Sequence, residues 1–231
     1  MPTTSTHEPD QGAPGTRERL LAAAAAEFLE HGYERASLRR ICAEAGVTTG
    51  ALYFVFKNKD DLFRAVVAPL VDPAREVLEA SAASREERIP FFGDKGLGVF
   101  AAGGVFADPY DAYGVLSVCY EHRDIVHVLF SCRDAPYEQE LERGVADFAR
   151  DDLLALIRLH DAPAEIWDDF MVRWYSRIIA QTFADVLEAD ETLEGARTHL
   201  EDVVTFIYDG TASLLAPRAS ASAPASGEAG A

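Results

Sequence analysis

The chain has 231 residues, of which 48% are hydrophobic and 26% charged, and its formal net charge is −18. These values are typical of a soluble globular protein with one large domain or two smaller ones. Membrane and secreted proteins are disfavoured, because no apolar run reaches the roughly 20 residues of a membrane helix and the first fifteen residues do not resemble a secretory signal. Three cysteines, an odd and sparse set, favour a reducing compartment, so the sequence predicts a cytoplasmic protein.

The negative charge is unevenly distributed along the chain. Between Thr16 and Arg64, eight basic residues stand against seven acidic ones, so the excess of acid belongs to the remainder. A nearly neutral segment can approach a polyanion that the chain as a whole would repel. The composition therefore permits nucleic-acid binding without establishing it.

Helical periodicity runs through nearly the whole chain and predicts an all-α fold. Residues 1–13 and 216–231 are the exceptions, because their Thr, Pro, Gly, Ala and Ser composition predicts a disordered arm and a disordered tail. We find no strand alternation and no long internal repeat. The predicted helices cover residues 16–31, 38–45, 49–55, 59–82, 85–92, 95–103, 110–132, 137–160, 163–189 and 192–215.

Two short helices joined by a tight turn are predicted over residues 37–56. Gly46 permits the positive φ that such a turn commonly requires. In DNA-binding proteins this arrangement places the second helix in the major groove while the first braces across it. The second helix begins with small and polar residues that suit base edges, followed one turn later by an aromatic residue: Thr48, Thr49, Gly50 and Tyr53.

Phosphate contacts are predicted on either side of this helix pair. Ser37 can cap its helix, and the first amides of that helix can hold a phosphate. Lys57 and Lys59 follow the second helix, where the DNA backbone would pass. The alternative interpretation is a helical hairpin inside an ordinary bundle, since short helix pairs around glycine are common.

Five motifs in order extend this pattern over residues 16–67: an alanine-rich helix ending in FLEHGY, then SLRRI, AGV, GALY and FKNKDDL. Together they resemble the N-terminal DNA-binding domain of TetR-family (tetracycline-repressor-type) transcriptional regulators. The resemblance implies a three-helix domain over residues 14–74, with the helix-turn-helix motif at 37–56. A larger C-terminal helical domain for ligand binding and dimerisation would follow over residues 75–215.

The resemblance also implies DNA-contact roles at matching positions. Ser37 and Arg39 correspond to contacts at the opening of the motif, and Phe54 lies where an aromatic residue often packs along the DNA backbone. Lys59 corresponds to a phosphate contact. The full set of implied contacts is Ser37, Arg39, Thr48, Thr49, Gly50, Tyr53, Phe54, Lys57 and Lys59. Val55 departs from the family pattern, where many members have His or Tyr, so no contact is assigned to it.

The last two predicted helices carry broad apolar stripes that need burial on more than one side. A homodimeric four-helix interface would cover them, and the alternative is that both face a core within one chain. The predicted interface residues are Phe170, Trp174, Ile178, Val203, Ile207 and Leu214.

Aromatic and polar residues in the C-terminal part suit a small-molecule pocket, which the family's C-terminal domain usually contains. The candidates are Phe92, Phe106, Tyr113, Tyr120, His127, Phe130 and Trp174. Core packing is the alternative role for each of them.

Metal and catalytic sites are not predicted. Cys119, His122, His127 and Cys132 would point all round the axis of one continuous helix, so they cannot converge on one ion. No nucleophile elbow, phosphate loop or cofactor fingerprint is present, so the sequence predicts a non-enzyme without a cofactor. It favours a homodimeric repressor that binds a near-palindromic double-stranded operator and is released by a small molecule, with no membrane partner. The alternative is an acidic helical ligand-binding or scaffold protein that binds no operator.

Overall fold

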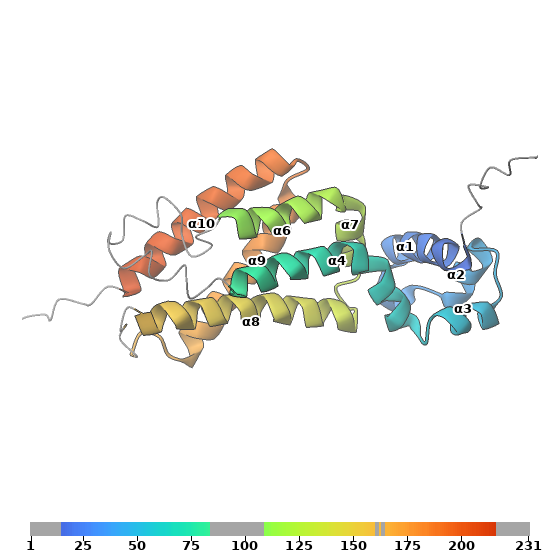
Figure 1. Ribbon diagram of the computed structural model, residues 1–231, viewed down its shortest axis with the longest axis horizontal. Helices are drawn as coiled ribbons and strands as arrows, with labels where there is room; N and C mark the ends of the chain where they lie inside the picture. Colours follow the sequence, from blue (N-terminus) through green and yellow to red (C-terminus); the bar gives the residue numbers. More distant parts are fainter. Residues whose placement is uncertain (1–14, 84–108, 160–161, 163–164, 216–231) are drawn as a thin grey trace, which may run out of the picture. The chain divides into compact units, whose positions relative to one another are not determined.

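The computed structural model describes residues 15–83, 109–159, 162 and 165–215 (Figure 1). Every regular element in these ranges is an α-helix, which confirms the predicted all-α fold. The helices are α1 (Thr16–Arg35), α2 (Leu38–Glu44), α3 (Thr49–Val55), α4 (Lys59–Ala83), α6 (Pro109–Glu121), α7 (Arg123–Ser131), α8 (Pro136–Leu159), α9 (Asp169–Ala189) and α10 (Leu193–Leu215). The helices predicted over 85–92 and 95–103, like the two chain ends, lie outside the described residues.

The chain forms two compact units. We call the first the head unit; its described residues are 15–76 and 117–143. The second, the C-terminal unit, contains the described residues of 77–116 and 144–215. Residues 117–143 were expected in the C-terminal domain, but in the structure they pack with the N-terminal helices, because α7 and the start of α8 supply apolar side chains to the head core.

Three aromatic rings form the centre of the head core. Phe28 of α1 lies edge-on to Phe63 of α4, with ring centroids 5.1 Å apart, and stacks on Tyr33 at 6.0 Å. Cys132, which follows α7, is fully buried in the same cluster, and its Sγ lies 3.6 Å from the backbone oxygen of Phe28. Each large side chain buried in this way stabilises the fold by about 1.5–3 kcal/mol.

Gly32 allows α1 and α7 to approach closely. Its φ of +70° interrupts the helical backbone of α1, and a Cβ at this position would lie 3.0 Å from the backbone oxygen of Ser131. Gly32 thus ends the regular helix predicted over 16–31, and a short helical piece continues to Arg35. Glycine is therefore required here both for its backbone conformation and for its size.

An arginine on α4 binds the first turns of α8 within the head unit. The Arg64 guanidinium donates to Asp60 at 2.8 Å and to Glu140 at 2.7 Å, and it lies 3.9 Å from the ring centroid of Tyr137. Arg75, three turns further along α4, donates to the Tyr137 hydroxyl at 3.2 Å. These contacts fix α8 to α4 where both helices belong to the head unit.

Two predicted helices differ from the observed ones. The single helix expected over 110–132 is wrong, because the backbone leaves the helical region at His122 (φ −120°, ψ 43°), where α6 ends and α7 begins. The helix expected from residue 163 begins at Asp169, where the Asp168 side chain accepts a hydrogen bond from the Met171 amide at 2.9 Å. Trp167, just before this cap, is buried instead of continuing the helix.

The C-terminal unit contains α9 and α10 packed against each other. Its described core combines the second half of α8 with the inner face of α9, and Trp167 meets Tyr175 edge-on at 6.4 Å. The buried members of this core are Ala149, Leu153, Trp167, Tyr175 and Ile179. Within the described ranges, no helix has the length and apolarity that crossing a membrane requires.

Candidate nucleic-acid interface

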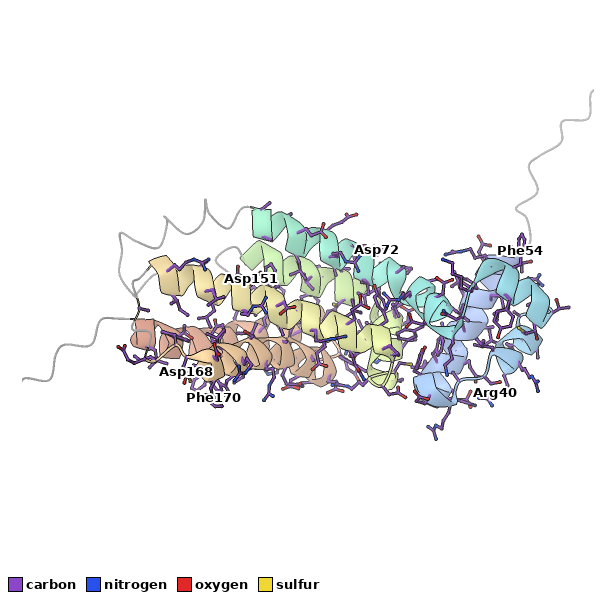
Figure 2. All side chains as sticks on the ribbon, turned by 90° about the horizontal axis from the view of Figure 1, so that it is seen from below. Arg40, Phe54, Asp72, Asp151, Asp168 and Phe170 are labelled. Atoms are coloured by element: carbon purple, nitrogen blue, oxygen red, sulfur yellow. The ribbon has the colours of Figure 1, made fainter. Side chains whose placement is uncertain are left out.

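Helix α3 anchors one face in the head core and presents the other to solvent. Leu52 and the following Phe56 are buried, whereas Tyr53 is 54% exposed and Phe54 is 92% exposed. Figure 2 shows Phe54 projecting outward from the head unit. Burying one such ring would stabilise the chain by about 1.5–3 kcal/mol, so an aromatic pair left outside is a surface suited to a partner.

The turn before α3 fixes the direction of this exposed face. Gly46 has a φ of +63°, as predicted, and its amide donates to the Ala43 carbonyl at 3.2 Å. The Val47 amide donates to the Cys42 carbonyl at 2.9 Å. This pair of bonds is a Schellman motif, which ends α2 sharply and lets α3 start in a new direction.

The first residues of α3 form a small polar surface. Thr48 is the N-cap, and its hydroxyl accepts a hydrogen bond from the Ala51 amide at 3.2 Å. Thr49 and Gly50 follow it, and all three residues are exposed. Val55, at the other end of α3, is partly buried and packs against the head core. The predicted contact positions on α3 thus lie outside, whereas Val55, to which no contact was assigned, lies inside.

The two arginines of the SLRRI segment have different environments. Arg40 (labelled in Figure 2) binds both carboxylate oxygens of Glu27 on α1, and it also donates to the Arg35 carbonyl at 2.9 Å. This bond to Arg40 lowers the pKa of the Glu27 carboxyl. Arg39, in contrast, is exposed and makes no side-chain bond to any described residue. Arg40 therefore orients α2, and Arg39 remains available to a partner.

Ser37 stands at the N-cap position of α2, but its hydroxyl makes no capping hydrogen bond. The prediction that its side chain caps the helix is therefore wrong. The Glu27 carboxylate instead accepts a hydrogen bond from the Ser37 backbone amide at 2.7 Å, and it also holds Arg40. Sequence reasoning missed Glu27, because nothing in a single helix indicates a partner ten to thirteen residues away.

The two lysines that follow α3, Lys57 and Lys59, also differ in their contacts. Lys57 is exposed, and its ammonium contacts no described residue. The Lys59 ammonium donates to the carbonyls of Glu34 and Ala36, at 3.1 and 3.2 Å, and lies 4.5 Å from the ring centroid of Tyr33. Because an ammonium has three donors, Lys59 uses two of them to fix the end of α1 to the start of α4.

Two further cations lie beside the motif and were not predicted as contacts. The Arg17 guanidinium lies 5.7 Å from the ring centroid of Phe56, at the end of α3. The Arg19 guanidinium lies beside Gly46, 3.7 Å from the place a Cβ would take. Both come from the first turn of α1, and their close spacing at the start of the first helix was the available signal.

The predicted interface residues of the C-terminal unit fall into two groups. Phe170 and Trp174 of α9 are 62% and 44% exposed, and Val203 of α10 is also exposed. Ile178, Ile207 and Leu214 are partly buried against the core of their own unit. The list missed Phe206, which is 80% exposed; it lies one helical turn after Val203, and that spacing was the available signal.

The predicted pocket residues are not gathered into one cavity within a described unit. Phe92 and Phe106 lie outside the described residues. Tyr120, His127 and Phe130 belong to the head unit, with His127 exposed, and Tyr113 and Trp174 belong to the C-terminal unit. The Tyr113 hydroxyl donates to Glu201, and the Arg197 guanidinium lies 4.5 Å from the centroid of its ring.

A groove of about 490 Å³ runs along the first half of α10. Its lining is mixed polar and apolar and contains none of the predicted pocket residues; it consists of Leu193, Glu194, Arg197, Thr198 and Glu201. The apolar ligand pocket therefore stays a prediction.

The cysteines are buried and unpaired. Burial raises the pKa values of the Cys119 and Cys132 thiols to about 12, so both are protonated at neutral pH. Although the helix breaks at His122, the described residues contain no cluster of three or more metal-ligating side chains.

A short helix, a tight turn through a positive-φ glycine and a second helix with an exposed polar and aromatic face define a helix-turn-helix protein. Residues 20–66 match the family model for "Bacterial regulatory proteins, tetR family". The N-terminal segment of this chain is thus similar to the tetR-family regulators, in agreement with the resemblance found in the sequence.

Two relatives illustrate the extent of this similarity. The HTH-type transcriptional repressor BepR of Brucella suis biovar 1 (strain 1330) is 41% identical over 63 residues, which are 27% of this chain and 30% of BepR. The probable acrEF/envCD operon repressor of Escherichia coli (strain K12) is 36% identical over 77 residues, which are 33% of this chain and 34% of that repressor. In each case the matched part is about a third of the relative's length or less.

The fold as a whole has a counterpart among solved structures. A TetR-like transcriptional regulator from Rhodococcus sp. RHA1 superposes with a TM-score of 0.51 at 16% identity, covering 85% of this chain and 96% of that chain. At this identity the likeness supports the helical fold and nothing more specific.

Proposed function

We propose that the chain is a homodimeric transcriptional repressor whose α3 enters the major groove of a near-palindromic operator. The match of residues 20–66 to the tetR-family model supports the class of activity. The observation that carries the proposal is the exposed face of α3, on which Thr49, Tyr53 and Phe54 are open to solvent while Leu52 is fully buried. A structural hairpin inside a bundle would cover this face.

The charges around α3 suit a polyanion. Arg39 and Lys57 are exposed and unpaired among the described residues, and Arg17 lies at the end of α3. Contacts of such cations with phosphates position a protein on DNA, whereas the Thr49 and Tyr53 side chains would read base edges. The acidic remainder of the chain stays compatible with DNA binding, because these cations all come from the nearly neutral segment that contains the helix-turn-helix motif.

A dimer built through α9 and α10 would present two copies of α3 to one duplex. Phe170, Trp174, Val203 and Phe206 would be covered in this dimer. A two-fold axis favours half-sites about 34–36 Å apart, or a multiple of this spacing. A small molecule bound in the C-terminal unit would release the operator, with a coupling free energy typically of about 1–3 kcal/mol.

A fluorescence-anisotropy titration tests the proposal. The probes are duplexes tiled over the DNA that flanks the gene of this protein, at 100 mM salt, and we expect one of them to bind at least 1,000-fold more tightly than the others. The Tyr53→Ala variant should lose most of this preference. The control is Leu29→Ala, because Leu29 is a similarly exposed apolar residue on α1.

The alternative, an acidic helical scaffold or ligand-binding protein, predicts a different result. It would bind all duplexes equally weakly, and Tyr53→Ala would then leave DNA affinity unchanged. Equal affinity for every duplex probe, together with no enriched motif from a random DNA library, would contradict the proposed repressor function.

A further inference from the structure

Opposite charges border the exposed apolar residues of α9 and α10. On α9, Arg173 and Arg177 flank Trp174, one residue before it and one turn after it, and both are exposed. On α10, Asp202 is exposed and lies one residue before Val203 and one turn before Phe206. The basic group and the acidic group therefore lie on different helices of the same unit.

These charges have no hydrogen-bonding partner within the described chain. Neither arginine makes a side-chain hydrogen bond or ion pair with a described residue, and Asp202 accepts no such bond. Its neighbour His199 is already held by Asp190, with 2.7 Å between the ring nitrogen and the carboxylate oxygen. Two cations next to exposed aromatic rings are notable in a chain with 21 basic and 39 acidic residues, because most of its surface would repel a second copy.

We propose that in the homodimer α9 of one subunit packs across α10 of the partner, so that Arg177 pairs with Asp202 of the partner subunit. A two-fold interface uses the same patch on both copies, so each pair occurs twice. If α9 lay on the partner's α9 with the two-fold axis at Trp174, arginines would face arginines, and α10 on the partner's α10 with the axis at Asp202 would bring acid against acid. The crossed arrangement brings opposite charges together and covers the aromatic residues of both helices. An antiparallel α9–α9 packing in a shifted register would instead bring Arg177 to an acidic residue of the same helix in the partner, so it is the competing arrangement.

The pairing rests on the homodimer proposed above and specifies its geometry. Phe170, Trp174 and Phe206 would supply the buried anchors, because aromatic residues dominate the binding energy of such interfaces. The charged groups beside these aromatic residues would favour the packing of α9 on the partner's α10 and disfavour binding to other proteins. A second copy of this chain supplies the matching charges, whereas a related chain with acidic residues in place of Arg173 and Arg177 would not.

A charge exchange tests the pairing by sedimentation equilibrium of the full-length chain at 50 mM salt. We expect Arg177→Glu and Asp202→Lys each to raise the dimer Kd at least tenfold, because each removes two attractions and creates two repulsions. The double variant Arg177→Glu/Asp202→Lys should return to within about threefold of the wild-type Kd. Circular dichroism should stay unchanged in all three, because both residues are exposed.

Two control variants make the test specific. Arg158→Glu reverses an exposed cation on α8 and should leave the dimer Kd unchanged. Asp185 lies further along α9, where its carboxylate accepts a hydrogen bond from Gln181 at 2.7 Å. In an antiparallel arrangement of α9 on the partner's α9, Asp185→Lys would rescue Arg177→Glu, and this rescue would overturn the crossed pairing.

The failure of the pairing and the failure of the homodimer give different results. If the double variant were as weak as the sum of the two single effects while the wild type stayed dimeric, only the pairing would be overturned. A wild-type chain that sediments as a monomer at 10 μM would overturn both the pairing and the proposed homodimer.

Discussion

Helix α3 and the α9–α10 pair both leave aromatic side chains in solvent, but the residues around those rings differ. Close in sequence to Tyr53 and Phe54 are exposed threonines, a glycine and cations that pair with no described residue, and these suit a polyanion that carries hydrogen-bonding groups. Beside Trp174 and Phe206 stand one basic and one acidic border, which suit a second copy of the same surface. The exposed rings make both surfaces candidates for an interface, and the neighbouring charges favour a different occupant for each.

The largest difference in stability is expected between a variant that loses a buried ring and a variant that loses an exposed one. Phe28→Ala removes a fully buried ring at the centre of the head core and should lower the free energy of unfolding by about 3–5 kcal/mol. Phe206→Ala removes a ring that is mostly exposed in the single chain, so it should change the unfolding of the monomer by only about 0.5 kcal/mol. Urea denaturation followed by circular dichroism measures both.

The dependence of the unfolding midpoint on protein concentration shows whether Phe206 lies in a dimer interface. If Phe206 lies in a dimer interface, the unfolding midpoint of the wild type should rise with protein concentration, and that of Phe206→Ala should rise less. Phe28→Ala should keep the concentration dependence. A Phe206→Ala chain destabilised as strongly as Phe28→Ala at low concentration would place Phe206 in a core instead.

The two lysines after α3 provide the next contrast. Lys59→Ala removes two charge-assisted hydrogen bonds to the end of α1, so it should lower stability by about 1.5–3 kcal/mol. Lys57→Ala should leave stability unchanged and weaken binding to all DNA sequences alike, with the salt slope reduced by about 1. Thermal unfolding and anisotropy titrations at three salt concentrations separate the two roles, and equal stabilities of both variants would contradict the role given to Lys59.

A smaller effect is expected from Glu138 of α8. Burial, together with the nearby Glu142, raises the pKa of its carboxyl to about 7, while Arg133 opposes the shift. A carboxyl with a raised pKa stays protonated in the folded chain while it ionises in the unfolded chain, so stability should fall as the pH rises from about 4.5 to about 7. After allowance for solvent screening, the loss should be about 1 kcal/mol.

Glu138→Gln isolates this contribution. The variant should lose less stability than the wild type between pH 4.5 and 7, and the difference should level off above pH 7. Urea titrations at four pH values provide the measurement. Parallel pH profiles for the two chains would show that this carboxyl does not titrate as proposed.

Local signals predicted much of the head unit. The alanine-rich helix and the Ala-Gly-Val turn each depend on only a few residues, so α1 and the turn at Gly46 agree with expectation. The start of α4 is equally local, since the Asn58 side chain accepts a hydrogen bond from the Asp61 amide at 2.8 Å.

Contacts between distant residues were not predictable in this way. The place of residues 117–143 in the head unit depends on contacts such as that between Phe28 and Cys132, which are 104 positions apart. The break at His122 has no glycine or proline to signal it. Charge pairing between Glu27 and Arg40 joins two helices, and only the folded chain brings them together. The position of a ligand pocket depends on distant contacts of the same kind, and the described aromatic candidates are divided between the two units.

The most direct test of DNA reading by α3 is binding-site selection from a random duplex library, with wild type and Thr49→Ala in parallel. For the wild type, we predict a near-palindromic motif with half-sites about one helical turn apart, or a multiple of it. The variant should keep the motif but lose preference at one symmetric pair of positions, by about 1–3 kcal/mol for each contact. An identical motif from both chains, or no enriched motif from either, would contradict the assignment of α3 as the helix that reads DNA.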